Sequence, residues 1–187
     1  MFSYIVDKDI RLQLLAEGHA DELFRLIERN RTHLREWLPW VDATVHPEDT
    51  RRFIESTRAS FFDRHGLHAG IFYRGVLVGC IGLNQLDWLN RKTSVGYWLG
   101  AEYQGQGIMT RSCRGLLNYV FSELGFNRVE IRAAVENRKS RAIPERLGFT
   151  QEGILREAEW LYDHYVDHVV YGMLKREWKN PKDGWEG

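Results

Sequence analysis

The chain has 187 residues, a length that suits one domain, and its 26 Lys and Arg residues equal its 26 Asp and Glu residues. A chain of this size can bury roughly 70% of the surface that it exposes when unfolded, which is enough for one core. Because charges of both signs are mixed, the sequence gives no basic field for nucleic acid or for an anionic membrane.

Membrane segments, disulfides and metal sites are not expected either. The N-terminus lacks a basic stretch followed by an apolar one, and no apolar run reaches the ~18 residues needed to cross a bilayer. Cys80 and Cys113 lie in apolar segments, which is typical of buried thiols in a reducing compartment. His164 and His168 would share a strand face, but without a third ligand they predict no zinc site. We therefore expect a cytoplasmic protein.

The first third of the chain predicts one strand followed by helices. Residues 10–14 alternate between apolar and polar side chains, as strands do. Apolar residues three and four apart predict a helix over 19–30, and a short helix capped by its first residue is expected over 32–37. A longer helix is predicted over 47–64, because Pro47 is tolerated in a first turn and acidic residues follow it.

The segment 34–41 is rich in large apolar side chains. Such a segment predicts core packing or a lid, or alternatively the wall of a substrate groove, and the sequence leaves both open. Three strands are expected next, over 67–73, 76–86 and 91–99, with Arg74-Gly75 as the hairpin turn between the first two.

A glycine loop at the centre of the chain connects an apolar strand to an amphipathic helix. The strand ends at Leu99, the loop contains Gly105 and Gly107, and the helix carries one apolar stripe. The stripe consists of Cys113, Leu116, Leu117, Val120, Phe121 and Leu124. Glycines that lead into a helix N-terminus leave backbone N–H groups free, and the helix dipole attracts an anion there. We interpret residues 104–110 as a cradle for a diphosphate.

Two common nucleotide-binding motifs do not fit this cradle. A P-loop requires a lysine directly after its last glycine, but Ile108 follows Gly107. A dinucleotide-binding fingerprint requires a third small residue, and this sequence has Thr110 at that position.

The last third of the chain predicts a strand over 128–135, a helix over 138–147, and an antiparallel pair over 149–160 and 164–175. The order of strands and helices indicates one α+β domain with a mixed sheet flanked by helices. The strands on either side of the cradle helix should be parallel neighbours joined by a right-handed crossover. A frayed tail is expected from residue 180.

Several motifs resemble those of one family in their order and spacing. Gln104-x-x-Gly107-x-Met109 resembles the Gln/Arg-x-x-Gly-x-Gly/Ala signature of the GNAT superfamily of N-acetyltransferases. The later blocks 137–141 and 146–149 look like the family's Asn-x-x-Ser helix, which ends in Gly-Phe. The phrases NRKTSVGYWL and ENRKSRAIPERLGF narrow the resemblance to the branch with the Rim-type ribosomal-protein N-terminal acetyltransferases. Met109 is a departure, since the broad signature prefers Gly or Ala at this position.

The resemblance implies an acetyltransferase domain over residues 9–177 and a C-terminal tail over 178–187. The implied fold is a mixed, mostly antiparallel sheet of about seven strands flanked by helices. Two parallel strands of this sheet splay apart, and the pantetheine arm of the cofactor lies between them. A helix-loop-helix near 34–41 would overhang the acceptor.

The implied reaction is direct transfer of an acetyl group from acetyl-CoA, the cosubstrate, to a primary amine. The acceptor implied by the branch is the N-terminal α-amine of a protein, of the ribosomal-protein type. Two alternatives stay open: a small-amine acetyltransferase acting on a polyamine, amino acid or aminoglycoside, and a non-catalytic acyl-CoA-binding module. Neither cysteine lies at the cradle, so a covalent enzyme intermediate lacks its nucleophile. The seven Trp residues are compatible with a homodimer surface.

The same motifs indicate the cofactor-binding residues. The backbone of the cradle would bind the diphosphate, and the strand edge before it would pair with the pantetheine amides like an added strand. The cradle residues are Gln104, Gly105, Gln106, Gly107, Ile108, Met109 and Thr110, and the strand residues are Tyr97, Trp98 and Leu99. Asn137 is predicted to bind the pantetheine arm or only to cap its helix. The basic run 138–141, which ends in Arg141, is predicted to meet the 3′-phosphate of the cofactor or to be only a solvated helix end.

Two residues are predicted to act in the chemical step. Because an α-amine has a pKa near 8, roughly a tenth of it is neutral at pH 7, and a modest carboxylate suffices as base. Glu157 and Glu159 are expected on one face of a strand, and the resemblance favours Glu159 as this base. Ser140 is the predicted partner of the leaving thiolate, with Tyr97 and Tyr162 as alternatives.

Overall fold

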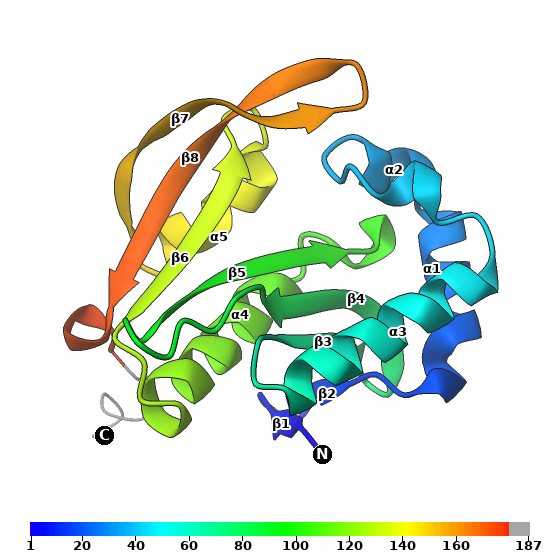
Figure 1. Ribbon diagram of the computed structural model, residues 1–187, viewed down its shortest axis with the longest axis horizontal. Helices are drawn as coiled ribbons and strands as arrows, with labels where there is room; N and C mark the ends of the chain where they lie inside the picture. The colour runs from blue at the N-terminus through cyan, green and yellow to red at the C-terminus, as the bar shows by residue number, and fades with distance from the viewer. Residues whose placement is uncertain (180–187) are drawn as a thin grey trace.

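Eight strands form one sheet in the computed structural model, which describes residues 1–179 (Figure 1). Their order across the sheet is β1-β2-β3-β4-β5-β6-β8-β7. The strands are β1 (Ser3–Ile5), β2 (Ile10–Leu14), β3 (Leu67–Tyr73), β4 (Val76–Leu83), β5 (Lys92–Leu99), β6 (Arg128–Ala134), β7 (Thr150–Leu161) and β8 (His164–Leu174). Every neighbouring pair is antiparallel except β5 and β6. The predicted α+β fold is confirmed, with one strand more than expected.

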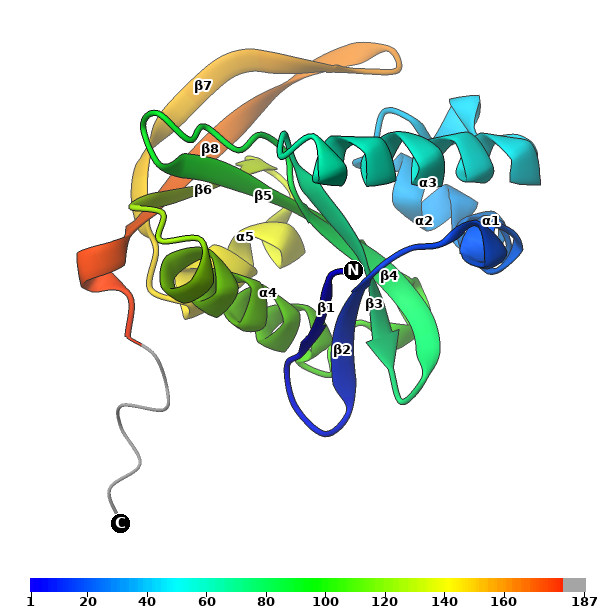
Figure 2. The ribbon, with the colours of Figure 1, turned by 60° about the horizontal axis from the view of Figure 1, so that its bottom comes forward.

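Helices cover both faces of the sheet. The α-helices of the described residues are α1 (Ala20–Arg29), α2 (Arg31–Arg35), α3 (Pro47–Phe62), α4 (Ile108–Asn118) and α5 (Arg138–Arg146). Figure 2 shows α4 and α5 on one side of the sheet and α1 and α3 on the other. We call these sides the α4 face and the α3 face. Each has its own apolar core, with Leu116 and Ile143 in the first and Leu23 and Ile54 in the second.

The two cysteines are buried, one in each core. Cys113 belongs to the core of the α4 face, and Cys80 belongs to that of the α3 face. Burial in apolar surroundings raises the pKa of each thiol to about 12, so both stay protonated at neutral pH. No helix within residues 1–179 is long and apolar enough to cross a membrane.

Some element boundaries differ from the predicted ones, because pairing and packing partners decide them. β1 is absent from the predicted elements, and its short segment is a strand only because it pairs with β2. The strand predicted over 76–86 ends at Leu83. The helix after the cradle changes at Asn118 into a π turn over Tyr119–Glu123. α2 begins at Arg31, and no side chain caps it.

The C-terminal end of the described chain packs onto the sheet domain. Trp178 donates from Nε1 to Asn118 Oδ1 at 2.8 Å and its ring lies 6.1 Å from that of Phe121. The tail that the sequence predicts from residue 180 lies outside the described residues.

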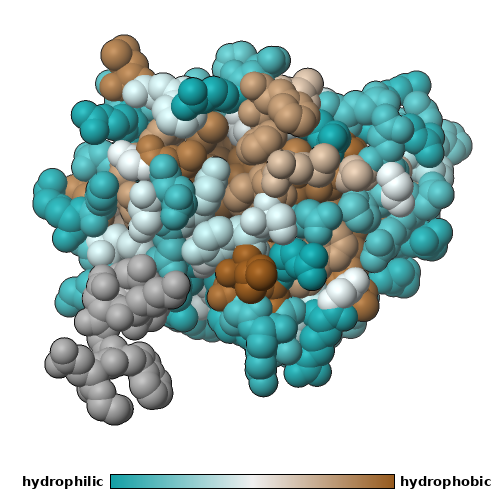
Figure 3. Space-filling view, turned by 90° about the horizontal axis from the view of Figure 1, so that it is seen from below, coloured by the Kyte–Doolittle hydropathy of each residue, from teal (hydrophilic) through white to brown (hydrophobic). Residues whose placement is uncertain are grey.

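The sheet has two free edges, formed by β1 and β7. Seen from below, where β1 lies, the surface shows apolar patches among hydrophilic side chains (Figure 3). Ile5 of β1 is 74% exposed, and Ile154 of β7 is 53% exposed. Apolar side chains therefore reach the surface at both edges.

The parallel strands β5 and β6 separate along their length (Figure 1). Their pairing begins at Lys92 and ends where Val95 meets Ile131. Beyond this point β5 continues along β4 to Leu99, whereas β6 continues along β8 to Ala134. The splay is therefore present, and the strand edges that face it have no ladder partner.

Candidate active site

The loop before α4 has the geometry of an anion-binding site. Gly105 and Gly107 both have φ of +74°, a left-handed conformation that glycine adopts without strain. A side chain at Gly105 would meet no atom within 4 Å, so the loop is open on its outer side. From Gly105 to Thr110, no backbone N–H donates to an acceptor in the described part of the chain. These free donors at a helix N-terminus are what a diphosphate requires.

Met109, the departure from the family signature, does not obstruct this loop. Its side chain is 6% exposed and that of Ile108 is 1% exposed, because both pack in the core of the α4 face. Gln106 is exposed, and Thr110 is half-buried. The accessible side of the loop therefore consists mainly of backbone and glycine.

Two side chains that the sequence analysis missed hold the cradle in place. Asn30 follows α1, is only 4% exposed, and accepts a hydrogen bond from the Ala101 N–H at 2.8 Å. His33 Nε2 lies 3.3 Å from the Leu99 carbonyl oxygen and 3.2 Å from Gln104 Nε2. Asn30 could have been noticed in the sequence as a polar residue directly after the apolar stripe of a helix. No local sequence pattern indicates a role for His33.

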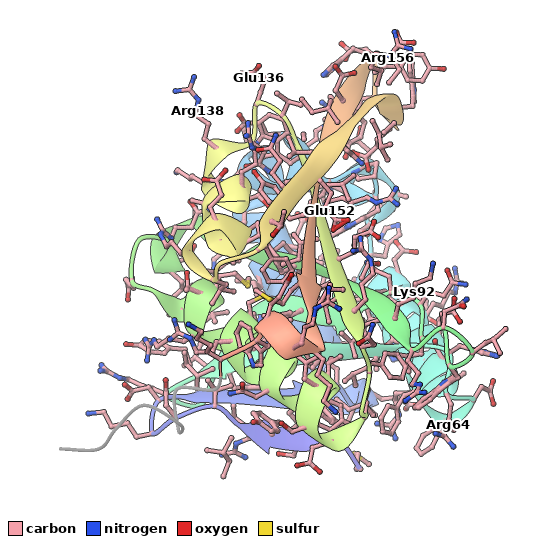
Figure 4. The ribbon with its side chains drawn as sticks, turned by 90° about the vertical axis from the view of Figure 1, so that its left-hand side faces the viewer. Arg64, Lys92, Glu136, Arg138, Glu152 and Arg156 are labelled. Carbon is pink, nitrogen blue, oxygen red and sulfur yellow. The ribbon has the colours of Figure 1, made fainter. Side chains whose placement is uncertain are left out.

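Of the basic residues at the start of α5, some are exposed and one is hydrogen-bonded to Tyr171 within the protein. Lys139 Nζ lies 3.3 Å from Gln104 Oε1, so this cation is beside the cradle. Arg138 points outward into solvent (Figure 4). Arg141 instead donates to the Tyr171 hydroxyl at 2.9 Å and to a backbone carbonyl at 2.8 Å. Lys139 and Arg138 are thus better placed than Arg141 to meet a phosphate.

The open edge of β5 presents backbone donors to the splay. Alternate residues of a strand turn their N–H and C=O groups to opposite edges. The Gly100 N–H and the Ser94 carbonyl bond toward β4, so Trp98 also faces β4. The backbone groups of Tyr97 and Leu99 then face the splay. Of the three predicted pantetheine-pairing residues, two present their backbone there and Trp98 does not.

Two candidate partners for a leaving thiolate lie together on the α4 face. The Tyr97 hydroxyl donates to the Ser140 carbonyl oxygen at 2.8 Å, and Ser140 Oγ lies 3.4 Å from Tyr97 Oη. Burial raises the pKa of Tyr97 well above its ordinary value, so this hydroxyl stays protonated. Asn137 caps α5, because its side chain accepts the Ser140 N–H at 3.3 Å. The capping role of Asn137 is therefore observed.

Glu159 lies on the other side of the sheet. Val169 and Tyr171 of β8 pack in the core of the α4 face, so the alternating residue His168 points to the α3 face, as Trp98 of β5 does. Glu159 Oε1 is 3.8 Å from His168 Nε2, and the Glu159 side chain is 31% exposed. The candidate base and the candidate thiolate partners are therefore on opposite faces of the splayed sheet.

The expectation that Glu157 and Glu159 lie along one regular strand face is wrong. The register of β7 shifts between Leu155 and Glu159, and Glu157 has a left-handed φ of +49°. Glu157 is exposed, whereas Glu159 is half-buried. The neighbouring Trp160 is 53% exposed and packs edge-on against Tyr165.

Tyr162, which the sequence offers as an alternative thiolate partner, is hydrogen-bonded at the tip of the β7–β8 hairpin. Its hydroxyl donates to the Leu38 carbonyl oxygen, and the Arg35 guanidinium lies 3.8 Å from the centre of its ring. Arg35 is itself held by Asp42, at 2.9 Å. The tip of the β7–β8 hairpin is thus tied to the segment after α2, and Ser140 and Tyr97 are left as the thiolate candidates.

The segment 34–41 packs in the core, and its role as the wall of a substrate groove stays a prediction. Leu34 and Val41 are buried in the core of the α3 face. Trp40 is half-buried, and its ring lies 6.0 Å from that of Trp98 on β5. The segment therefore packs into the core and also places an aromatic wall beside the splay.

Two acidic groups on the α3 face, Glu130 and Glu159, have basic neighbours. Glu130 of β6 accepts hydrogen bonds from Arg132 Nε at 2.8 Å and from Arg128 Nη2 at 3.0 Å. Glu159 contacts His168, as described above. Among the described residues, no group of three or more His, Cys, Asp or Glu side chains is arranged to hold a metal ion.

Comparison with known proteins gives one consistent result. Residues 9–150 match the family described as acetyltransferase (GNAT) domain. The chain is 42% identical to a putative ribosomal N-acetyltransferase, YdaF, of Bacillus subtilis, over 97% of this chain and all of the relative. It resembles the microcin self-immunity acetyltransferase MccE, solved with acetyl-CoA and AMP, with 32% identity, a TM-score of 0.87, and coverage of 90% and 94% of the two chains.

A third similar protein is RimL, an α-N-acetyltransferase of ribosomal protein L7/L12 solved with coenzyme A. The TM-score is 0.90 and the identity is 27%, over 92% of this chain and 98% of that chain. Three comparisons of different kinds thus agree on the fold, and the matched regions contain the cradle, the splay and the start of α5.

Proposed function

This chain belongs to the GNAT acetyltransferase family, and we propose that it transfers the acetyl group of acetyl-CoA to the N-terminal α-amine of a protein, of the ribosomal-protein type. The single observation that carries this proposal is the run of backbone N–H groups from Gly105 to Thr110, which have no acceptor within residues 1–179, beside the open splay of β5 and β6. The names of YdaF and RimL support the acceptor class.

The residues of the cradle fit a coenzyme A diphosphate. Its free N–H groups supply donors, the positive end of α4 adds partial charge, and Lys139 adds a cation beside Gln104. The backbone of Tyr97 and Leu99 would pair with the pantetheine amides in the splay. Asn137, which caps α5, has amide donors left for the same arm. Bound there, acetyl-CoA supplies an acyl group activated as a thioester.

The chain's own groups would then divide the chemical step between the two faces. On the α3 face, Glu159 accepts the proton of the incoming amine, directly or through one water. The Leu99 N–H donates to the thioester oxygen as it gains negative charge. On the α4 face, the Ser140 hydroxyl donates a hydrogen bond to the leaving sulfur, with Tyr97 as the alternative donor.

The lining of the acceptor side favours a neutral peptide amine over a polyamine. A polycation would require several uncompensated carboxylates, but Glu130 lies between two arginines. The neighbouring wall of Trp40 and Trp98 is aromatic. An acceptor with one amine and an apolar or small neighbouring side chain suits these surroundings better than a small polyamine.

The proposed domain extends beyond the matched residues 9–150, because β7 and β8 complete the sheet and carry Glu159. A cytoplasmic location and a homodimer stay predictions from the sequence. The decisive experiment is release of free thiol from acetyl-CoA with a panel of N-terminal peptides, lysine-containing peptides with blocked N-termini, spermidine and aminoglycosides.

We expect turnover with peptides that have a free N-terminus and little with the other acceptors. Mass spectrometry of the products should place the acetyl group on the α-nitrogen. Preference for spermidine or an aminoglycoside would support the small-amine alternative. A protein that binds acetyl-CoA but releases no thiol with any amine would be the non-catalytic module.

A further inference from the structure

The β7–β8 hairpin contains a large bulge directly before Glu159. Leu155 pairs with His168 and Glu159 pairs with Val166, so β7 advances by four residues where β8 advances by two. Residues 156–158 therefore lie opposite one residue of β8, Asp167. Bulges of this kind bend a strand and re-aim the side chains that follow.

The bulge decides which glutamate reaches the acceptor side. In an uninterrupted antiparallel ladder that starts from the Leu155–His168 pair, Glu157 would stand opposite Val166. The two extra residues give that position to Glu159 instead. Glu159 consequently lies 3.8 Å from His168, whereas Glu157 is exposed.

Asp167 holds this bulge from the opposite strand. Its Oδ1 accepts a hydrogen bond from the Glu157 N–H at 2.7 Å. Its backbone carbonyl accepts the Val135 N–H at 3.0 Å, which anchors Asp167 to the end of β6 beside the splay. Glu157 has a left-handed φ of +49°, a conformation that non-glycine residues rarely adopt without such support.

We propose that Asp167 is a positioning residue for the acetyl transfer: by binding the Glu157 N–H it fixes the bulge that delivers Glu159 to the acceptor amine. This inference rests on the proposed function, since it assigns a role to a residue that acts through the proposed base. Within residues 1–179, the one hydrogen bond of the Asp167 carboxylate is to the Glu157 N–H. Its effect is therefore confined to the geometry of β7.

The test compares Asp167→Ala, which removes the acceptor oxygen, with Asp167→Asn, which keeps an oxygen that can accept the same N–H. We expect Asp167→Ala to lower kcat for a peptide acceptor about 10²-fold, because a displacement of about 1 Å in a reacting group has an effect of this size. Asp167→Asn should stay within about threefold of wild type. The affinity for acetyl-CoA, measured by calorimetry, should be unchanged in both variants.

A second comparison separates positioning from a general loss of structure. In a Glu159→Gln background, Asp167→Ala should lower kcat little further, because both substitutions remove the same contribution. The matched control is Glu157→Ala, which keeps the backbone N–H and removes only an exposed side chain, and it should behave like wild type. Thermal melting of each variant checks that the fold is retained.

Amide hydrogen exchange at Glu157 gives a readout that does not depend on activity. Exchange should be slow in wild type and in Asp167→Asn, and fast in Asp167→Ala. The proposal is overturned if Asp167→Ala keeps wild-type kcat. It is also overturned if Asp167→Ala lowers kcat by the same factor in the Glu159→Gln background as in the wild-type protein. A wild-type protein that acetylates no amine at all would overturn the proposed function instead, while the exchange data would still report on the bulge.

Discussion

The cofactor side and the acceptor side of the splay are built in different ways. The cradle uses backbone N–H groups of consecutive residues, Gly105 to Thr110, at the start of α4. The proposed acceptor side consists of side chains from separate strands, such as Glu159 of β7 and His168 of β8, whose approach depends on a bulge. A backbone site needs only a local conformation, whereas a side-chain site needs correct strand register over a long hairpin.

Because the two sides are built differently, substitutions in them should change different kinetic and binding constants. Substitutions in the cradle should change affinity for acetyl-CoA and leave the acceptor chemistry intact. Substitutions on the hairpin should change turnover and leave acetyl-CoA affinity intact. The following predictions, from the largest expected effect to the smallest, test this division.

Glu159→Gln should lower kcat by about 10²–10³-fold, because it removes the proposed general base. The loss should narrow as pH rises toward 9, since more of the α-amine is then neutral without help from the enzyme. Steady-state thiol release across pH measures both effects. A variant with wild-type kcat at every pH would remove Glu159 as the base, and altered acetyl-CoA affinity would break the division between the two sides.

Gly107→Val should weaken acetyl-CoA binding by about 10²-fold, because a β-branched residue at a left-handed position is strained and its side chain blocks the free N–H groups. Titration calorimetry measures the change. Gly153→Val on β7 is the matched control: Gly153 has no positive φ, and a Cβ at this position would have no atom within 4 Å, so acetyl-CoA affinity should not change. Normal affinity in Gly107→Val would count against the cradle.

Ser140→Ala should lower kcat about tenfold, the typical value of one hydrogen bond to a charged group. Tyr97→Phe serves as its comparison, because the two hydroxyl oxygens lie 3.4 Å apart. Tyr97→Phe should affect folding stability through the lost bond to the Ser140 carbonyl more than it affects kcat. If Tyr97→Phe lowers the single-turnover rate more than Ser140→Ala does, Tyr97 is the partner of the leaving thiolate.

Lys139→Met should weaken acetyl-CoA binding about two- to fivefold, and the difference from wild type should shrink at high salt, because an exposed cation is screened. Arg141→Met should instead lower thermal stability and leave acetyl-CoA affinity nearly unchanged, since Arg141 is bonded to Tyr171 and to a backbone carbonyl. Calorimetry at two salt concentrations distinguishes them. A larger loss of affinity in Arg141→Met would restore its predicted role at the 3′-phosphate.

Asp7→Asn should have the smallest effect, a loss of about 1 kcal/mol in the free energy of unfolding at pH 7. Burial opposes ionisation of Asp7, but hydrogen bonds from the Asp9 and Ile10 N–H groups and from Arg111 of α4 outweigh it and hold the pKa of Asp7 below its ordinary value. Because the pKa of Asp7 is lower in the folded protein, its ionised carboxylate stabilises the fold at pH values above the ordinary Asp pKa. This stabilisation is lost as the pH falls through the folded-state pKa. In urea titrations the difference in stability between the two proteins should therefore shrink as the pH falls below the ordinary Asp pKa of 3.8.

Much of the conformation of the proposed cofactor side could be predicted from the sequence. The glycines of residues 104–110 and the apolar helix after them predict a phosphate-binding turn, because φ preferences and helix periodicity are local properties. The side chain of Met109 was ambiguous, and only packing shows that it turns into the core. His33 had no signal, since its contact with Leu99 joins segments far apart in the chain.

The acceptor side was readable only in part. The sequence named two glutamates as candidate bases but could not choose between Glu157 and Glu159 on physical grounds, because alternation alone gives both the same face. The choice depends on a shift in register that Asp167 stabilises from the neighbouring strand. Tyr162 looked equivalent to Tyr97 in the sequence, and its contact with Leu38 separates their roles.

The sequence by itself predicted the order of strands and helices except for β1, and the glycine turn before α4, since each depends on residues close together in the chain. The tertiary structure alone decided where β5 and β6 part, which of the two glutamates approaches His168 and which side chains contact the loop before α4. These features depend on pairing between distant segments, where a shift of one or two residues changes which side chain meets which partner and leaves the local pattern the same.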